Sequence, residues 1–276
     1  MNHRSLIFDL FGGYIRYAGG RISLRSLAAV VEPFGVSTDA LRVVMSRLRR
    51  EGWQEVTRTA SGAEYRATAE MWEVLDEGYD RIFRPAEPAW DGQWRMVIYE
   101  VPETERALRD QLRKQLAWLG FGQLVSSTWL SCHDRLDAVG AWVAEHPVAR
   151  IETLVARSQS EEQDRRFAHR CWDLDTVAAD YAAFVRQFGS TANRHSWEHA
   201  QGVDALVARV RLVHEYRLFA FRDPRLPGHL LPDAWPGPSA DRLFAQAYNH
   251  LETEAVAAFE ALTGAAVVIP DRETYR

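Results

Sequence analysis

The sequence predicts an α+β protein built from three segments. Three observations support this: two helical patterns joined by a glycine turn and followed by a hairpin pattern, an alternation of strand and helix patterns in mid-chain, and an almost wholly helical remainder. With 276 residues, 47% of them hydrophobic and 26% charged, the chain has an ordinary globular composition, which excludes a largely disordered protein. We expect domains at 1–88, 89–172 and 173–276, with Pro85 and Pro88 ending the first.

In the first segment, Ser23 can cap a helix that runs to Phe34, and Ser37 can cap a second helix that runs to Arg50. The glycine turn between them at Gly35 gives a helix-turn-helix arrangement. Two strand patterns follow, at 54–57 and 64–67, and the loop between them resembles a hairpin wing. The segment is therefore predicted to be a winged helix, the form in which the second helix enters the DNA major groove.

The second helix has two distinct faces. Leu41, Val44, Met45 and Leu48 follow helical spacing and are expected to pack on the first helix, while Val43 lies with arginines on the opposite face. The sequence has no acid between Ala40 and Arg50. The guanidinium group of arginine can bind the edge of a guanine bidentately or bind a backbone phosphate. Each arginine of this helix can therefore read a base or contact the DNA backbone. The alternative is an amphipathic helix that merely exposes its charges to solvent. The predicted DNA contacts are Ser37, Thr38, Arg42, Ser46, Arg47, Arg49, Arg50, Arg58 and Arg66.

The charge distribution agrees with a DNA-binding first segment. The whole chain has a net charge of −5, which by itself argues against nucleic acid. Residues 1–66, however, contain 10 arginines against 6 acids, a net charge of +4, and the remainder has a net charge of −9. The positive charge thus lies in the segment that would need it, and the negative remainder would limit non-specific DNA binding.

The middle segment predicts a ferredoxin-like domain. Strand patterns at 94–100, 123–125, 128–131 and 151–155 alternate with helical patterns at 103–119 and 136–145, which is the split β-α-β order. Glu100 ends the first of these strands. A carboxylate there can hold a divalent cation, as in nucleases, or can simply face solvent, and we favour the second interpretation.

The third segment is helical apart from a loop rich in proline and glycine at 223–238, and it contains one motif of an enzyme. The string from His195 through Glu198 to His199 matches the inverted zincin pattern, in which two histidines bind zinc and the glutamate is the base. Glycines flank the string, and no third ligand stands at a recognisable spacing. A metal-dependent hydrolase is therefore kept as the alternative to a DNA-binding protein.

A second set of residues in this segment mixes cationic and apolar positions. Arg211, His214 and Arg217 can converge on a phosphorylated ligand, or they can pair with nearby acids. Both interpretations stay open.

The composition predicts a cytoplasmic protein. Cys132 and Cys171 are the only cysteines and form no Cys-x-x-Cys pair, so neither a disulfide framework nor a thiolate zinc site is expected. No apolar run reaches the length that a bilayer requires, and Asp9 interrupts the apolar start of the chain. No phosphate-binding glycine loop or other cofactor motif is present, so no cofactor or metal is expected.

Several motifs resemble those of the PaaX-type transcriptional regulators, a family named for phenylacetic acid degradation, and the similarity covers nearly the whole chain. The most specific is the pairing of Glu215-Tyr216-Arg217 with the proline-rich loop from Asp223 to Trp235. The weaker ones are Ser5–Gly12, Arg47–Trp53, Trp94-Arg95, Val97–Glu103 and Gly120-Phe121-Gly122.

The resemblance implies a winged helix, a central domain similar to the small CRISPR-associated endoribonuclease that serves assembly rather than cleavage, and a helical C-terminal domain. It also implies a homodimer without enzymatic activity that binds double-stranded operator DNA. In that family the protein represses an aromatic catabolic operon of the phenylacetate type, and phenylacetyl-CoA or a related acyl-CoA relieves the repression. We expect that effector between the central and C-terminal domains. The chain departs from the family in Glu100, where aspartate is usual, and in Gly13 inside the opening helix.

Overall fold

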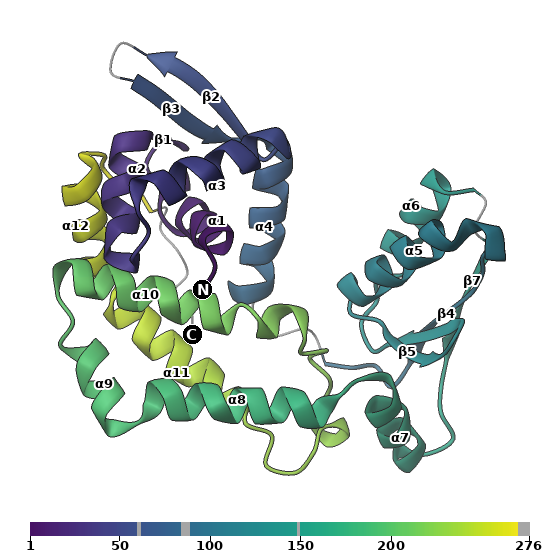
Figure 1. Ribbon diagram of the computed structural model, residues 1–276. Helices are drawn as coiled ribbons and strands as arrows, with labels where there is room; N and C mark the ends of the chain where they lie inside the picture. Colours follow the sequence, from purple (N-terminus) through teal and green to yellow (C-terminus); the bar gives the residue numbers. More distant parts are fainter. Residues whose placement is uncertain (60–61, 84–88, 148–149, 270–276) are drawn as a thin grey trace. The chain divides into compact units, whose positions relative to one another are not determined.

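The computed structural model describes residues 1–59, 62–83, 89–147 and 150–269 (Figure 1). The chain forms two compact units. Unit 1 is made of three pieces of chain, residues 1–84, 182–220 and 237–276, and unit 2 of two pieces, residues 85–181 and 221–236. The first and third segments expected from the sequence thus contribute jointly to unit 1.

Unit 1 begins with α1 (His3–Gly13), whose N-terminus is capped by Asn2. After a 3-10 turn (η1, Ile15–Tyr17) and a short strand β1 (Arg21–Ser23), α2 (Leu24–Val31) and a second 3-10 turn (η2, Glu32–Phe34) lead into α3 (Thr38–Arg50). The predicted caps are confirmed, because the hydroxyl of Ser23 accepts a hydrogen bond from Ser26 N and that of Ser37 from Ala40 N. Gly35 takes φ 78° at the turn, a conformation that glycine adopts without steric cost.

The hairpin after α3 belongs to a three-stranded antiparallel sheet. Strands β2 (Gln54–Thr59) and β3 (Gly62–Ala67) pair along their whole length, and β1 pairs with β3, which gives the order β1-β3-β2. The sequence pattern missed β1. It also ended the first strand of the hairpin two residues too early and began the second two residues too late, so Arg58 lies within β2 rather than in the loop. Positions 60 and 61 lie outside the described residues. Helix α4 (Ala69–Phe83) follows.

Helices from the end of the chain complete unit 1. They are the second half of α8 (Leu174–Gly189), α9 (Thr191–Glu198), α10 (Gly202–Tyr216), α11 (Gly237–His250) and α12 (Glu252–Thr263). In Figure 1, α12 lies beside α2, and α10 packs against α1. The apolar face of α1, with Leu6, Ile7, Leu10 and Phe11, is buried in this arrangement. Helices α1 and α2 therefore share a core with helices that follow them by more than 130 residues.

Unit 2 contains the strand and helix elements that the sequence predicts, in the predicted order. They are β4 (Trp94–Glu100), α5 (Arg106–Trp118), β5 (Gly122–Val125), β6 (Thr128–Ser131), α6 (Leu136–Glu145) and β7 (Arg150–Ala156). The four strands form an antiparallel sheet of order β5-β6-β4-β7. The predicted helix start at Glu103 differs, since residues Glu103–Glu105 form a 3-10 turn (η3) after Pro102.

Each face of this sheet has its own core. Val97, Leu112 and Trp129 belong to a cluster that joins β4 and β6 to α5 and α6. Trp94 and Leu130 belong to a second cluster, which includes Ala168 of α7 (Glu161–Cys171) and residues of the proline-rich loop, whose 3-10 turn is η5 (Gly228–Leu230). Helix α7 approaches β5 so closely that a Cβ added to Gly122 would lie 2.5 Å from Trp172 Cε2 and 2.6 Å from Cys171 Cβ.

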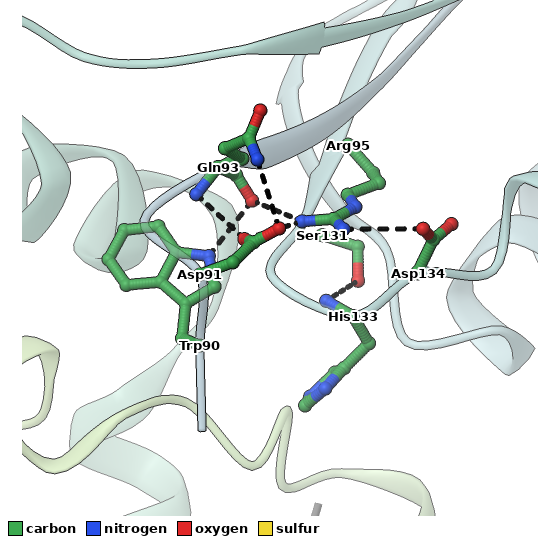
Figure 2. A network of polar contacts seen from close by, with 7 residues as sticks. All are labelled: Trp90, Asp91, Gln93, Arg95, Ser131, His133 and Asp134. Carbon is green, nitrogen blue, oxygen red and sulfur yellow. Dashed lines mark hydrogen bonds and ion pairs between the residues drawn. The ribbon is translucent and has the colours of Figure 1, made fainter. Parts of the chain in front are cut away.

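A polar network fixes the start of β4 (Figure 2). Arg95 donates hydrogen bonds to Asp91 Oδ1 at 2.7 Å and to the Gln93 carbonyl at 2.9 Å, and it reaches Asp134 Oδ2 at 3.2 Å. The hydrogen bond from Arg95 lowers the pKa of the exposed Asp91 carboxyl below its ordinary value. The Arg95 guanidinium thereby ties the approach to β4 to the turn that follows β6.

The described part of the chain contains no helix that is both long enough and apolar enough to span a bilayer.

Candidate nucleic-acid interface

The inner face of α3 is buried in unit 1. Leu41, Met45 and Leu48 are at most 1% exposed, as the spacing predicts, and Val44 is half-buried. This packing fixes which side of the helix faces solvent.

The outer face of α3 combines cations with one exposed apolar side chain. Arg42, Ser46, Arg47, Arg49 and Arg50 are all exposed. Among them lies Val43, which is 70% exposed. An isolated exposed valine on a protein surface needs no special explanation, but on a helix that binds DNA it is suited to contact a thymine methyl group.

The arginines of this surface differ in how they are partnered. Arg42 pairs with Asp39 at 2.8 Å, and Arg47 lies 3.7 Å from Glu51, which also receives a hydrogen bond from Arg4 at 2.7 Å. Within the described ranges, Arg49 and Arg50 have neither an ion pair nor a hydrogen bond through their side chains. The C-terminal end of α3 thus presents two cations without acidic partners.

The hairpin adds two further arginines. Arg66 of β3 pairs with Glu55 of β2 at 2.7 Å across the ladder, whereas Arg58 is exposed and has no side-chain partner in the described part of the chain. Ser37 uses its hydroxyl to cap α3, and Thr38 begins the helix. Both lie at the helix N-terminus, where backbone N–H groups face outward and favour an anion. The assignment of these residues to DNA contacts stays a prediction.

Two of the three predicted effector residues have an internal partner. Asp9 of α1 lies 2.7 Å from His214 Nδ1 and 3.0 Å from Arg217 Nε, and its carboxylate is only 6% exposed. The pairing with nearby acids that the sequence left open is thus present for His214 and Arg217. Arg211 is exposed and has no side-chain partner among the described residues. It lines a cleft in unit 1 together with His214.

Sequence reasoning missed Arg209, the most deeply buried cation of the described chain. Its side chain is 1% exposed, donates to the Tyr248 carbonyl at 3.2 Å and pairs with Glu252 at 2.7 Å. Its guanidinium carbon lies 3.9 Å above the centre of the Tyr248 ring. Burial disfavours the charged form, but Tyr14, Tyr248 and Glu252 outweigh that effect and raise the pKa of Arg209, so it remains a cation. Only its position on the apolar face of α10 marked it as unusual.

The inverted zincin string does not form a metal site in the described residues. His195 and His199 lie close together, with ring centres 4.0 Å apart, but Glu198 pairs with Arg194 at 3.0 Å. No group of three or more histidine, cysteine, aspartate or glutamate side chains gathers in the described residues as a bound metal would require. That search includes Glu100, which is exposed at the end of β4. Neither the hydrolase nor the nuclease alternative gains support from this geometry.

The chain resembles known proteins along nearly its whole length. Family models match residues 2–71 (PaaX-like protein), 87–168 (PaaX protein central Cas2-like domain) and 172–261 (PaaX-like protein C-terminal domain). It is 30% identical over 259 residues to the transcriptional repressor PaaX of Escherichia coli strain K12, covering 92% of this chain and 81% of that protein. Among solved structures, an uncharacterized protein, Rv0674 from Mycobacterium tuberculosis, shares the fold with a TM-score of 0.63 at 23% identity, over 94% of this chain and 97% of that one.

Proposed function

Since this chain belongs to the PaaX family of transcriptional regulators, we propose that it is a dimeric DNA-binding repressor of an aromatic catabolic operon of the phenylacetate type. In this proposal an acyl-CoA such as phenylacetyl-CoA releases it from double-stranded operator DNA, it acts in the cytoplasm, and it catalyses no reaction. The observation that supports it best is the outer face of α3, where exposed arginines surround the exposed Val43.

We assign DNA recognition to a winged helix within residues 1–88. Helices α2 and α3 joined at Gly35 supply the helix-turn-helix, and the β2–β3 hairpin supplies the wing. The expected docking places α3 in the major groove with the hairpin against the adjacent backbone. The assignment of residues 89–172 to a ferredoxin-like assembly domain and of 173–276 to effector response is part of the same proposal.

The distribution of partners divides the arginines of this surface into two groups. Among the described residues, Arg49, Arg50 and Arg58 have no acid to displace, so they can bind phosphate or guanine directly. Arg42, Arg47 and Arg66 must first leave Asp39, Glu51 and Glu55. Exposed ion pairs of this kind contribute only about 0–1 kcal/mol to stability. An arginine can therefore leave its carboxylate partner for a DNA phosphate at a small cost in free energy. All six are therefore compatible with DNA contact, and the unpaired ones should contribute most.

A twofold dimer would present two α3 helices to an inverted repeat, with half-sites about 34–36 Å apart. An effector releases such a dimer only if it binds more tightly to an arrangement that does not fit the repeat. A preference of about 100-fold for that arrangement supplies about 2.7 kcal/mol. Of the predicted effector residues, Arg211 has no side-chain partner in the part of the chain that the structure describes and could bind an anion directly, while His214 and Arg217 would have to exchange Asp9 for it.

The test is binding to a duplex that the wild-type protein selects from random-sequence DNA, measured by fluorescence anisotropy at several salt concentrations. Replacing Arg49 or Arg50 by alanine should weaken binding, and loss of a phosphate contact should reduce the salt dependence by about one unit of slope. Arg242→Ala, which removes an exposed arginine of α11, is the matched control and should bind like the wild type. Selection of no sequence at all, or equal binding by all three variants, would overturn the proposal.

A further inference from the structure

Unit 1 contains a cleft lined by two of the three predicted effector residues, Arg211 and His214. It has a volume of about 460 Å³ and is lined by residues of η2, α8, α9, α10 and α11. This volume lies in the lower part of the range of small-molecule sites, about 300–1,000 Å³. The cleft lies wholly within unit 1, between the turn that precedes α3 and the C-terminal helices.

Three of the eight apolar residues that line the cleft are aromatic. The aromatic residues are Phe34, Phe188 and Trp197, and the aliphatic ones include Leu212 of α10. Trp197 donates a hydrogen bond from Nε1 to the Phe188 carbonyl at 3.0 Å and is 5% exposed, so its position is fixed. Such walls favour a planar aromatic ring, because offset and edge-to-face contacts add to simple burial.

In the polar part of the lining, Arg211 is a cationic side chain without a partner among the described residues. Glu215 lines the same cleft one helical turn further along α10. The guanidinium fork matches a carboxylate bidentately. Glu215 repels an anion, so the two side chains should affect the affinity for an acid in opposite directions.

We propose that this cleft binds a small aromatic carboxylic acid, with its ring against Phe34, Phe188 and Trp197 and its carboxylate on Arg211. The ligand is the free acid, because a CoA thioester has lost that carboxylate and, with its pantetheine and nucleotide, is several times larger than such an acid. This inference goes beyond the acyl-CoA effector of the proposed function, because it assigns a free acid to a cleft that contains Arg211, one of the residues predicted for that effector.

The bound acid would contact two parts of the region that we assign to DNA recognition. Phe34 precedes Ser37, the N-cap of α3, by three residues. His214 lines the cleft and also holds Asp9 of α1. A ligand that binds more tightly to one arrangement of η2 and α10 than to another therefore favours that arrangement, and with it one position of α3. The ratio of the two affinities sets how far the equilibrium shifts.

The test is isothermal titration of the full-length protein, without DNA, with phenylacetate and benzoate as probes and phenylacetyl-CoA as a separate titration. Saturable binding of a free acid is expected. Arg211→Ala should weaken it about tenfold or more, since a hydrogen-bonded charge pair is lost. Glu215→Gln should tighten it, Arg242→Ala should leave it unchanged, and Ala208→Trp, which fills the cleft without altering its charge, should abolish it.

The inference is overturned if the folded wild-type protein binds neither free acid at millimolar concentration. Binding that Arg211→Ala and Ala208→Trp leave unchanged would overturn it as well, as would binding of the thioester alone. Because the titrations contain no DNA, such a result leaves the DNA-binding proposal to its own test on Arg49 and Arg50.

Discussion

Asp9 and His214 are 205 positions apart in the sequence, yet Asp9 Oδ2 lies 2.7 Å from His214 Nδ1. Arg217 approaches the other oxygen of the same carboxylate at 3.0 Å. One nearly buried side chain of α1 therefore links the start of the chain to α10, beside the cleft that His214 also lines.

Replacing Asp9 by alanine should destabilise unit 1. The variant removes the Asp9 carboxylate, so the largely buried side chains of Arg217 and His214 lose their acidic partner. Removal of one partner from a buried pair costs about 3–5 kcal/mol of stability. Urea unfolding followed by circular dichroism measures the change. Asp39→Ala is the control, since Asp39 is 90% exposed and its pair with Arg42 is worth little. Equal unfolding midpoints for the two variants would contradict this account of Asp9.

Val43 should contribute to base recognition rather than to stability. Its 70% exposure means that Val43→Ser should leave thermal unfolding nearly unchanged, while it lowers the affinity for a selected site that contains a contacted thymine. Replacing that thymine by uracil, which lacks only the methyl group, should weaken the wild-type protein by about 1 kcal/mol and leave Val43→Ser unaffected. If no thymine in the selected site shows this coupling, Val43 does not contact a base.

Gly122 should not tolerate a side chain. An added Cβ would meet Trp172 at 2.5 Å and Cys171 at 2.6 Å, so Gly122→Ala must push α7 away from β5 and should cost about 1–3 kcal/mol. Gly140→Ala in α6 is the matched control, since its Cβ meets nothing within 4 Å and the helix should gain about 0.5–1 kcal/mol. Thermal unfolding should therefore shift in opposite directions for the two variants. A shift in the same direction for both would contradict the tight packing at Gly122.

The thiol of Cys171 should react slowly in the folded protein. Burial raises its pKa to about 12, although Arg170 opposes the effect, so the nucleophilic thiolate is scarce at pH 9. The raised pKa contributes stability below the thiol's ordinary pKa of about 8.5, and this contribution declines as the pH rises from there towards 12. Iodoacetamide labelling at pH 9, resolved by mass spectrometry, should be much faster in urea than in buffer. Equal rates would show that Cys171 is not buried.

Local features of the fold could be predicted from the sequence. The caps at Ser23 and Ser37 and the spacing of Leu41, Met45 and Leu48 depend on residues within one or two turns, and all appear in the structure. β1 could not be predicted, because a strand of three residues has no measurable periodicity and forms only through its pairing with β3. The 3-10 turn at 103–105 could not be predicted either, because the helical pattern of the sequence runs through it into α5.

In the candidate sites, too, features set by local spacing could be predicted and contacts between distant residues could not. The exposed arginines of α3 follow from helical spacing alone, but their partners do not: Arg66 pairs across the hairpin, and Arg4 reaches Glu51 over 47 positions. The internal role of His214 and Arg217 depends on Asp9, and that of Arg209 on Tyr14, Tyr248 and Glu252. Contacts between such distant positions leave no periodic pattern in the sequence.

The division of unit 1 among three pieces of chain has a consequence for synthesis on the ribosome. The apolar face of α1 packs on α10, and α2 packs on α12, which ends at Thr263. Helices α1 and α2 are therefore translated well before the helices on which they pack, and their core is complete only after α12 has been translated. A nascent chain or a chain truncated before α12 would expose these faces, so folding of the region that we assign to DNA binding should depend on the synthesis of α12.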